Sequence, residues 1–155
     1  MSNPTSEQST TTPGTRAYKG SCPCGAVRFE ADLDLSAGTT RCNCTICKKT
    51  QWWGCITTPS AFRLLAGEEV LGDHTRSEAG HGRFCKTCGV RVFGHGDIPE
   101  LGGAYYSVNL NCLDGVDLTG VPVSYLDGLH DTWELLATAP HVDPVVAAQR
   151  SQASG

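Results

Sequence analysis

Closely spaced cysteines constrain the fold of this chain more than any other feature of its sequence. The 155 residues include nine cysteines, at positions 22, 24, 42, 44, 47, 55, 85, 88 and 112. An odd number of cysteines in CxC and CxxC spacings is typical of metal binding, whereas a disulfide framework usually belongs to a secreted chain with an even number. The spacing therefore predicts metal sites built from thiolates.

The first and last groups of cysteines share the signature of a tight turn. Each group is followed by glycine, in Cys22-Pro23-Cys24-Gly25 and in Cys85-Lys86-Thr87-Cys88-Gly89. Such a glycine can adopt a positive φ and turn its N–H toward a thiolate sulfur. Two turns of this kind, paired across the chain, supply the four thiolates of a closed structural zinc site. We predict this site at Cys22, Cys24, Cys85 and Cys88.

The middle group, Cys42, Cys44 and Cys47, has no trailing glycine and no fourth cysteine close by. Three thiolates leave one position of a tetrahedral zinc ion open, as in catalytic sites, where water or a substrate thiol binds and loses a proton. The alternative is that Cys55, Cys112 or a histidine closes the site, although both of these cysteines are expected to be small buried side chains.

Residues that follow the middle group have less specific roles. Lys48 and Lys49 would lower thiol pKa values and bind a carboxylate of the substrate, although exposed lysine pairs are usually just solvated. Trp52 and Trp53 would form one wall of a pocket or, as is commoner in a small β domain, part of the core.

The five histidines, at positions 74, 81, 95, 130 and 141, form no HExxH or similar metal-binding motif. His130 is the best histidine candidate for an acid or base, because a carboxylate neighbour in Asp127-Gly128-Leu129-His130 would set its tautomer. A surface histidine is the commoner case.

Short alternating segments predict an all-β fold. Apolar residues recur with period two around 27–29, 90–92, 105–110 and 121–125, and 18 glycines and eight prolines separate such segments. A helix is expected only as a turn or two after Cys44. We predict one domain over residues 17–139, with a polar disordered tail at 1–16 and a tail at 140–155 in which residues 142–146 could pack as an edge.

The charge and hydropathy of the chain exclude several classes of partner. It has 12 basic and 16 acidic residues, a formal net charge of −4, which argues against a nucleic-acid-binding or membrane-surface protein. Neither a membrane-spanning apolar segment nor a signal peptide is visible. We therefore expect a cytoplasmic protein whose partners are small molecules.

Three segments of the sequence, at residues 20–29, 42–49 and 84–90, resemble the glutathione-dependent formaldehyde-activating enzyme family, whose superfamily includes centromere protein V. Residues 108–114 and 127–130 are similar to the C-terminal segments of that family. The resemblance implies a β-tent fold and two zinc ions per chain, one structural on the four outer cysteines and one catalytic on the three middle cysteines. Asn43 stands where many relatives have a histidine, which bears on proton transfer.

The resemblance further implies a carbon–sulfur lyase similar to S-hydroxymethylglutathione synthase. Its partners would be a small thiol such as glutathione and a small electrophile such as formaldehyde, joined or separated at a carbon–sulfur bond. The alternative is a non-catalytic zinc-stabilised interaction module of the same fold, which would have two closed zinc sites.

Overall fold

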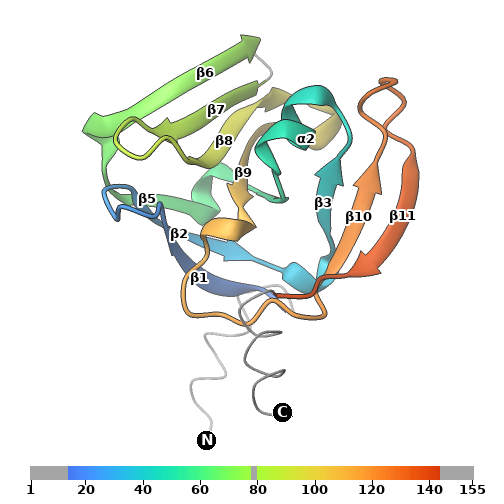
Figure 1. The fold of residues 1–155 in the computed structure, drawn as a ribbon, viewed down its shortest axis with the longest axis horizontal. Coiled ribbons are helices and arrows are strands. Elements are labelled where there is room, and N and C mark those ends of the chain that lie inside the picture. Colours follow the sequence, from blue (N-terminus) through green and yellow to red (C-terminus); the bar gives the residue numbers. More distant parts are fainter. Residues whose placement is uncertain (1–13, 78–79, 144–155) are drawn as a thin grey trace, which may run out of the picture.

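The computed structural model describes residues 14–77 and 80–143, whose strands form two sheets (Figure 1). The smaller sheet has the order β1 (Arg16–Ser21), β2 (Arg28–Leu33) and β5 (Phe62–Ala66). The larger sheet has the order β11 (Leu135–Pro140), β10 (Pro122–Leu126), β3 (Thr39–Cys42), β4 (Gly54–Thr57), β9 (Gly103–Asn109), β8 (Arg91–Ile98), β7 (Gly80–Cys85) and β6 (Leu71–Ser77). Most of the predicted N-terminal tail and residues 144–155 lie outside the described residues.

The predicted all-β architecture is confirmed, with one difference in strand direction. Neighbouring strands run antiparallel except for β3 and β10, which pair in parallel. Parallel strands need a long connection, and here β4 to β9 intervene in the sequence between the two. This pairing places Leu126 beside Cys42.

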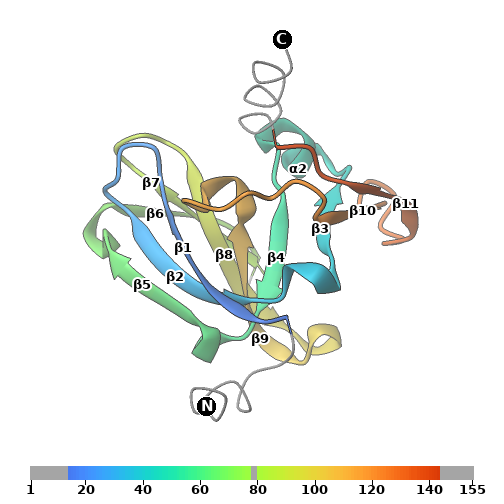
Figure 2. The same ribbon diagram turned by 90° about the horizontal axis from the view of Figure 1, so that it is seen from below.

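The core lies between the two sheets (Figure 2). Phe29, Ala31 and Leu33 alternate along β2 and are buried, as the period of two predicts. Phe62 of β5 closes the core from the same sheet, with its ring centroid 5.6 Å from that of Phe29 and 4.6 Å from that of Phe93 in β8.

A second part of the core surrounds Trp53, which is 1% exposed. Its indole N–H donates to the hydroxyl of Thr39 at 2.6 Å, and the ring of His141 lies 4.1 Å from the indole centroid. The backbone N–H of His141 donates to the carbonyl of Val121 at 2.9 Å. The chain therefore stays packed against the core two residues beyond the predicted limit of the domain at 139.

The short helix α2 (Thr45–Thr50) is the only α-helix among the described residues and lies where a turn or two of helix was predicted. Cys44 precedes its first turn, and Gln51 ends it in the left-handed conformation with a φ of 57°. Five 3₁₀ turns connect other elements, at Leu35–Ala37, Pro59–Ala61, Glu68–Val70, Pro99–Leu101 and Leu110–Cys112. No helix in the described part of the chain has the length and apolar character needed to cross a membrane.

Candidate metal centres

Two groups of cysteines are clustered in the structure. In each group the Sγ atoms lie within 4.8 Å of one another. A tetrahedral zinc ion with Zn–S bonds of about 2.3 Å holds its sulfur ligands about 3.8 Å apart, so both groups have a suitable size. They contain the residues that the spacing indicated: Cys22, Cys24, Cys85 and Cys88 in one, and Cys42, Cys44 and Cys47 in the other.

The four-cysteine group is formed by the turns that follow β1 and end β7. The Sγ atom of Cys24 lies 3.6 Å from that of Cys22 and 3.7 Å from that of Cys85. Because β1 belongs to the smaller sheet and β7 to the larger one, an ion bound here would join the two sheets and stabilise the fold.

The glycine that follows each turn has the predicted backbone conformation but makes a different hydrogen bond. Gly25 and Gly89 have φ values of 80° and 84°. Their amides donate to the carbonyl oxygens of Cys22 and Cys85, at 2.9 and 2.7 Å, and not to sulfur as expected. The left-handed glycine closes the turn, and it is the later amide of Val27 that donates to Cys22 Sγ, at 3.3 Å.

Backbone amides also stabilise the ionised form of Cys85. Hydrogen bonds from the amides of Cys88 and Thr87 lower the pKa of Cys85 to about 6, against the opposing effect of burial. A thiol with this pKa is mostly a thiolate at neutral pH, the form that binds metal.

The three-cysteine group lies where β3 leads into α2. Cys42 is the last residue of β3, Cys44 caps the helix, and Cys47 lies in its first turn. The amide of Cys44 donates to Cys42 Sγ at 3.4 Å. The change from strand to helix turns the three side chains toward a common point, which a continuous strand would not do.

Two of these three thiols resist ionisation in the absence of a cation. Burial and then the neighbouring Cys44 thiol raise the pKa of Cys47 to about 12, and burial also raises the pKa of Cys42. Three thiolates at this spacing need a positive charge among them. A soft thiolate set of this kind fits zinc.

The other two cysteines do not join the three-cysteine group. Cys55 and Cys112 are buried, and the Sγ atom of Cys112 instead lies 3.7 Å from the carbonyl oxygen of Arg91. Within residues 14–77 and 80–143, no further cysteine, histidine or carboxylate lies close enough to act as a fourth ligand. An added ligand would therefore come from outside this part of the chain.

A pocket of about 300 Å³ borders the three-cysteine group. Its lining includes Cys42 and Cys47 and two basic side chains, those of Lys48 in α2 and Arg41 in β3. The other lining residues are Asn43, Gln51, Trp52, Tyr125, Leu126 and Leu136. Lys49 is exposed and does not line the pocket.

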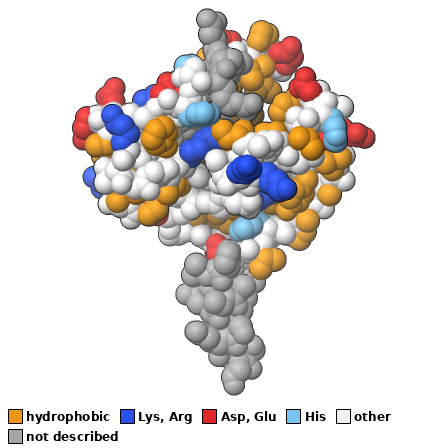
Figure 3. All heavy atoms as spheres, turned by 45° about the horizontal axis from the view of Figure 1, so that its top comes forward, with side chains coloured by type: hydrophobic (Ala, Val, Ile, Leu, Met, Phe, Trp, Pro, Cys, Tyr) orange, Lys and Arg blue, Asp and Glu red, His pale blue; other side chains and the backbone are white. Residues whose placement is uncertain are grey.

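On the face that carries α2, basic side chains stand beside hydrophobic ones (Figure 3). Among the described residues that line the pocket, none is acidic. The pocket therefore suits a ligand with a negatively charged part and an apolar part. Of the two tryptophans considered from the sequence, Trp52 lines the pocket and Trp53 belongs to the core.

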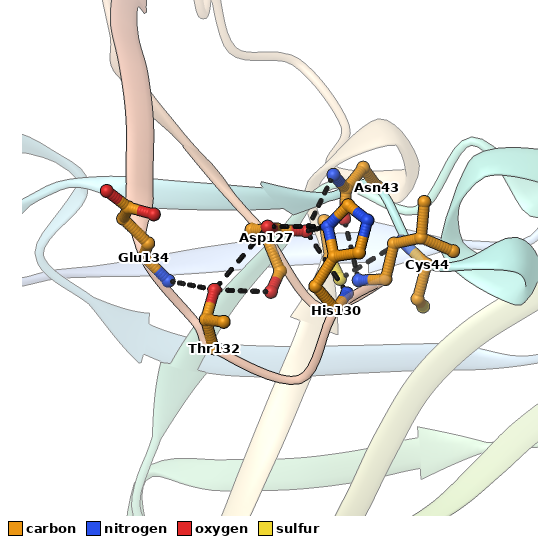
Figure 4. A network of polar contacts seen from close by, with 8 residues as sticks. Asn43, Cys44, Asp127, His130, Thr132 and Glu134 are labelled. Carbon is orange, nitrogen blue, oxygen red and sulfur yellow. Dashed lines mark hydrogen bonds and ion pairs between the residues drawn. The ribbon is translucent and has the colours of Figure 1, made fainter.

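Asn43, Asp127 and His130 point toward one another beside the three-cysteine group (Figure 4). The carboxylate of Asp127 accepts from the Asn43 amide at 3.1 Å and lies 2.9 Å from Nδ1 of His130. The hydrogen bond from His130 and then that from Asn43 outweigh burial and lower the pKa of Asp127. The side-chain carbonyl of Asn43 also accepts from the amide of Leu129, at 2.9 Å. The loop that carries His130 is thus attached to the residue between two of the metal ligands.

Sequence reasoning missed several of these residues. Arg41 precedes Cys42 directly, so its position gave a signal that was not used. Asn43 was noted only as a difference from the resembling family, and its role in holding Asp127 depends on the pairing of β3 with β10. Tyr125 and Leu136 are exposed residues of β10 and β11, and the sequence gives no sign that they border a pocket.

The sequence and the fold of the chain are similar to those of known proteins. The family model described as "glutathione-dependent formaldehyde-activating enzyme" matches residues 17–124, more than half of the chain. A crystal structure of a Rhodobacter sphaeroides protein is similar, with a TM-score of 0.56 and 30% sequence identity. This similarity covers 63% of the present chain and 89% of the Rhodobacter chain.

Proposed function

Because the chain belongs to the glutathione-dependent formaldehyde-activating enzyme family, we propose that it is a zinc-dependent carbon–sulfur lyase or synthase. The observation that carries the proposal is the three-cysteine group of Cys42, Cys44 and Cys47, which borders a pocket and has no fourth protein ligand within the described residues. An incomplete ligand set beside a pocket is the arrangement that distinguishes catalytic from structural zinc.

The proposed reaction joins a thiol to an aldehyde, and its reverse separates them. The S–H bond of the thiol breaks and a C–S bond forms to the carbonyl carbon. The carbonyl π electrons move to oxygen, which takes up a proton. Nothing is oxidised or reduced, so the reaction needs no redox cofactor. With glutathione and formaldehyde, the product is S-hydroxymethylglutathione.

The three cysteines would hold the catalytic zinc. When bound, the ion supplies Lewis acidity that stabilises the thiolate of a substrate thiol, whose pKa is otherwise about 8.5. The basic side chains of Lys48 and Arg41 would bind a carboxylate of that thiol, and Lys49 would add positive charge from the exposed side of α2. The other four cysteines would hold the second, structural zinc.

His130 is the proposed proton carrier. Its Nδ1 atom is hydrogen-bonded to Asp127, which fixes the tautomer and leaves Nε2 to exchange a proton. The His130 side chain is 70% exposed, so it can pass that proton to water. Many relatives have a histidine between the first two middle cysteines, where this chain has Asn43. His130 would take over the role of that histidine.

The zinc content of the reduced protein tests the two metal sites. We expect two zinc ions per chain in the natural sequence and one in Cys47→Ser. Cys55→Ser is the matched control, because Cys55 is a cysteine outside both groups, and it should retain two. Added glutathione should loosen one ion only. A natural chain with a single ion, or with two ions that glutathione does not affect, would favour the non-catalytic module.

Exchange between free and thiol-bound formaldehyde, followed by NMR, tests the activity. The natural chain should accelerate formation and cleavage of S-hydroxymethylglutathione, and Cys47→Ser should not. Failure of the zinc-loaded natural chain to accelerate exchange with any of several thiols and aldehydes would reject the enzymatic proposal.

All nine cysteines are free of disulfides, so we propose that the protein works in a reducing compartment such as the cytoplasm.

A further inference from the structure

The lining of the pocket beside the three-cysteine group combines two kinds of side chain. Arg41, Lys48, Asn43 and Gln51 are basic or carry an amide, and they are the polar partners for a thiol such as glutathione, with its two carboxylates and ammonium group. The apolar or aromatic residues are Trp52, Tyr125, Leu126 and Leu136. Strand pairing places Leu126 beside Cys42, so this apolar part of the lining begins at the sulfur ligands.

The apolar part of the lining offers more surface than a one-carbon electrophile can cover. Formaldehyde attached to sulfur adds only a hydroxymethyl group, which would leave most of the four apolar side chains exposed to water. Leu136 is 52% exposed and Tyr125 is 39% exposed. Burial of such surface by an apolar group of the ligand would be favourable.

The pairing of two strands positions part of this apolar lining. In the pairing of β10 with β11, Tyr125 lies opposite Ala137 and Leu126 lies opposite Leu135, so that Leu136 has no opposite residue. A register shift of this kind is a β-bulge, and bulges re-aim side chains near active sites. Tyr125, Leu126 and Leu136 also lie beyond the span of residues 17–124 that matches the family. Three of the four apolar lining residues therefore belong to the hairpin of β10 and β11.

We propose that the wall of Trp52, Tyr125, Leu126 and Leu136 binds the apolar substituent of the electrophile, so that the protein acts on thiol adducts of aldehydes with a hydrocarbon chain of several carbons. The inference rests on the proposed carbon–sulfur chemistry and narrows its substrate class. The bonds formed and broken are those of the formaldehyde reaction, with an alkyl group in place of one hydrogen on the carbonyl carbon.

Binding of stable thioethers to the zinc-loaded protein tests the wall without turnover. S-Methylglutathione and S-hexylglutathione differ only in the length of the alkyl chain. A buried methylene gains up to about fourfold in affinity, so the hexyl compound should bind at least about tenfold more tightly in calorimetry. Equal affinities would overturn the proposal.

Two leucine variants assign this preference to the wall. Leu136→Ala should remove most of the hexyl-to-methyl affinity ratio. Leu135→Ala is the matched control, because Leu135 lies in the same strand, is 58% exposed and does not line the pocket. It should keep the ratio of the natural chain. A loss of equal size in both variants would contradict the assignment to the pocket.

Turnover with different aldehydes separates this inference from the proposed carbon–sulfur chemistry on which it rests. With glutathione as the thiol, the acceleration over the uncatalysed reaction should be at least about tenfold greater for hexanal than for formaldehyde, and Leu136→Ala should reduce that ratio. Equal acceleration for the two aldehydes would reject the apolar substrate and leave the carbon–sulfur chemistry intact. If the protein accelerated the reaction of neither aldehyde, the proposed function itself would be rejected.

Discussion

The Nδ1 atom of His130 lies 2.9 Å from Oδ2 of Asp127, whose side chain is only 12% exposed. The same carboxylate accepts from the side chain of Asn43, between two of the candidate zinc ligands. A histidine held by a carboxylate has a defined tautomer and ring orientation. The contact thus joins a proton-carrying side chain to the segment that holds the metal.

Asp127→Asn is expected to lower turnover by about ten- to a hundredfold, because a positioned proton-transfer group contributes on the order of 10²- to 10⁴-fold and this change removes part of the positioning. The substitution keeps the size of the side chain and weakens its control of the His130 tautomer. We would measure kcat as a function of pH together with zinc content. His130→Gln should give a comparable loss and flatten the pH profile. Natural turnover and an unchanged pH profile in both variants would contradict a role for His130 in proton transfer.

Gly128→Ala is expected to disturb the three-cysteine group alone. A Cβ atom at Gly128 would lie 2.3 Å from Cys42 Sγ, too close for either atom to keep its place. We expect the variant to retain the structural zinc and to lose or bind weakly the second zinc, as measured by elemental analysis after a brief exposure to chelator.

Gly80→Ala is the control for this loss. Among the described residues, the nearest neighbour of its added Cβ would be the Tyr105 hydroxyl, at 3.8 Å. It should keep both ions. Two firmly held ions in Gly128→Ala would show that the loop at 128 is not packed against Cys42 as described.

Thr39→Val tests the polar contact inside the core. Thr39 is 1% exposed, accepts from the Trp53 indole at 2.6 Å and donates to the carbonyl of Pro122 at 2.9 Å. Valine has a similar shape but leaves both partners unpaired in the core, which should lower the free energy of unfolding by about 1–3 kcal/mol or more. Chemical denaturation would measure the change. Thr39→Ser keeps the hydroxyl and should lose less, and a larger loss in the serine variant would point to packing instead.

The two cysteine groups could be predicted from the sequence because ligand spacing is a local property. A CxC or CxxC turn followed by glycine specifies its geometry within five residues, and metal chemistry then pairs two such turns. The finer hydrogen bonds were not predictable in this way. The glycine conformation followed from the sequence, but the amide that reaches the sulfur, Val27, depends on the path of the chain after the turn.

The pocket and the His130 network could not be predicted, because they depend on strands distant in sequence. Alternation identifies a strand near 121–125 but not its neighbour. The parallel pairing of β10 with β3 brings Leu126 beside Cys42, and with it the loop of Asp127 and His130. A local pattern has no means to select this pairing over an antiparallel hairpin.

Acid is expected to release the ion of the three-cysteine group before that of the four-cysteine group. In the metal-free chain, burial and the Cys44 thiol raise the pKa of Cys47 to about 12, whereas the Cys88 amide lowers that of Cys85 to about 6. Protons therefore compete with metal for Cys47 throughout the neutral range, and the affinity of its group falls as the pH falls. Within the four-cysteine group the pKa of Cys24 is raised to about 11, because an amide hydrogen bond is outweighed by the neighbouring thiols together with burial. Protons begin to compete for Cys85 only near pH 6, and the four-cysteine group holds its ion with one more thiolate than the three-cysteine group.

Cobalt-substituted protein makes this order measurable, because thiolate-to-cobalt absorption decreases as each site loses its ion. A titration from neutral to acid pH should show two steps, and Cys47→Ser should lack the one at higher pH. The control Cys55→Ser should show both steps. A single step in the natural chain, or loss of the four-cysteine ion first, would contradict the assignment, since only the four-cysteine group has both a fourth thiolate and a thiol with a strongly lowered pKa.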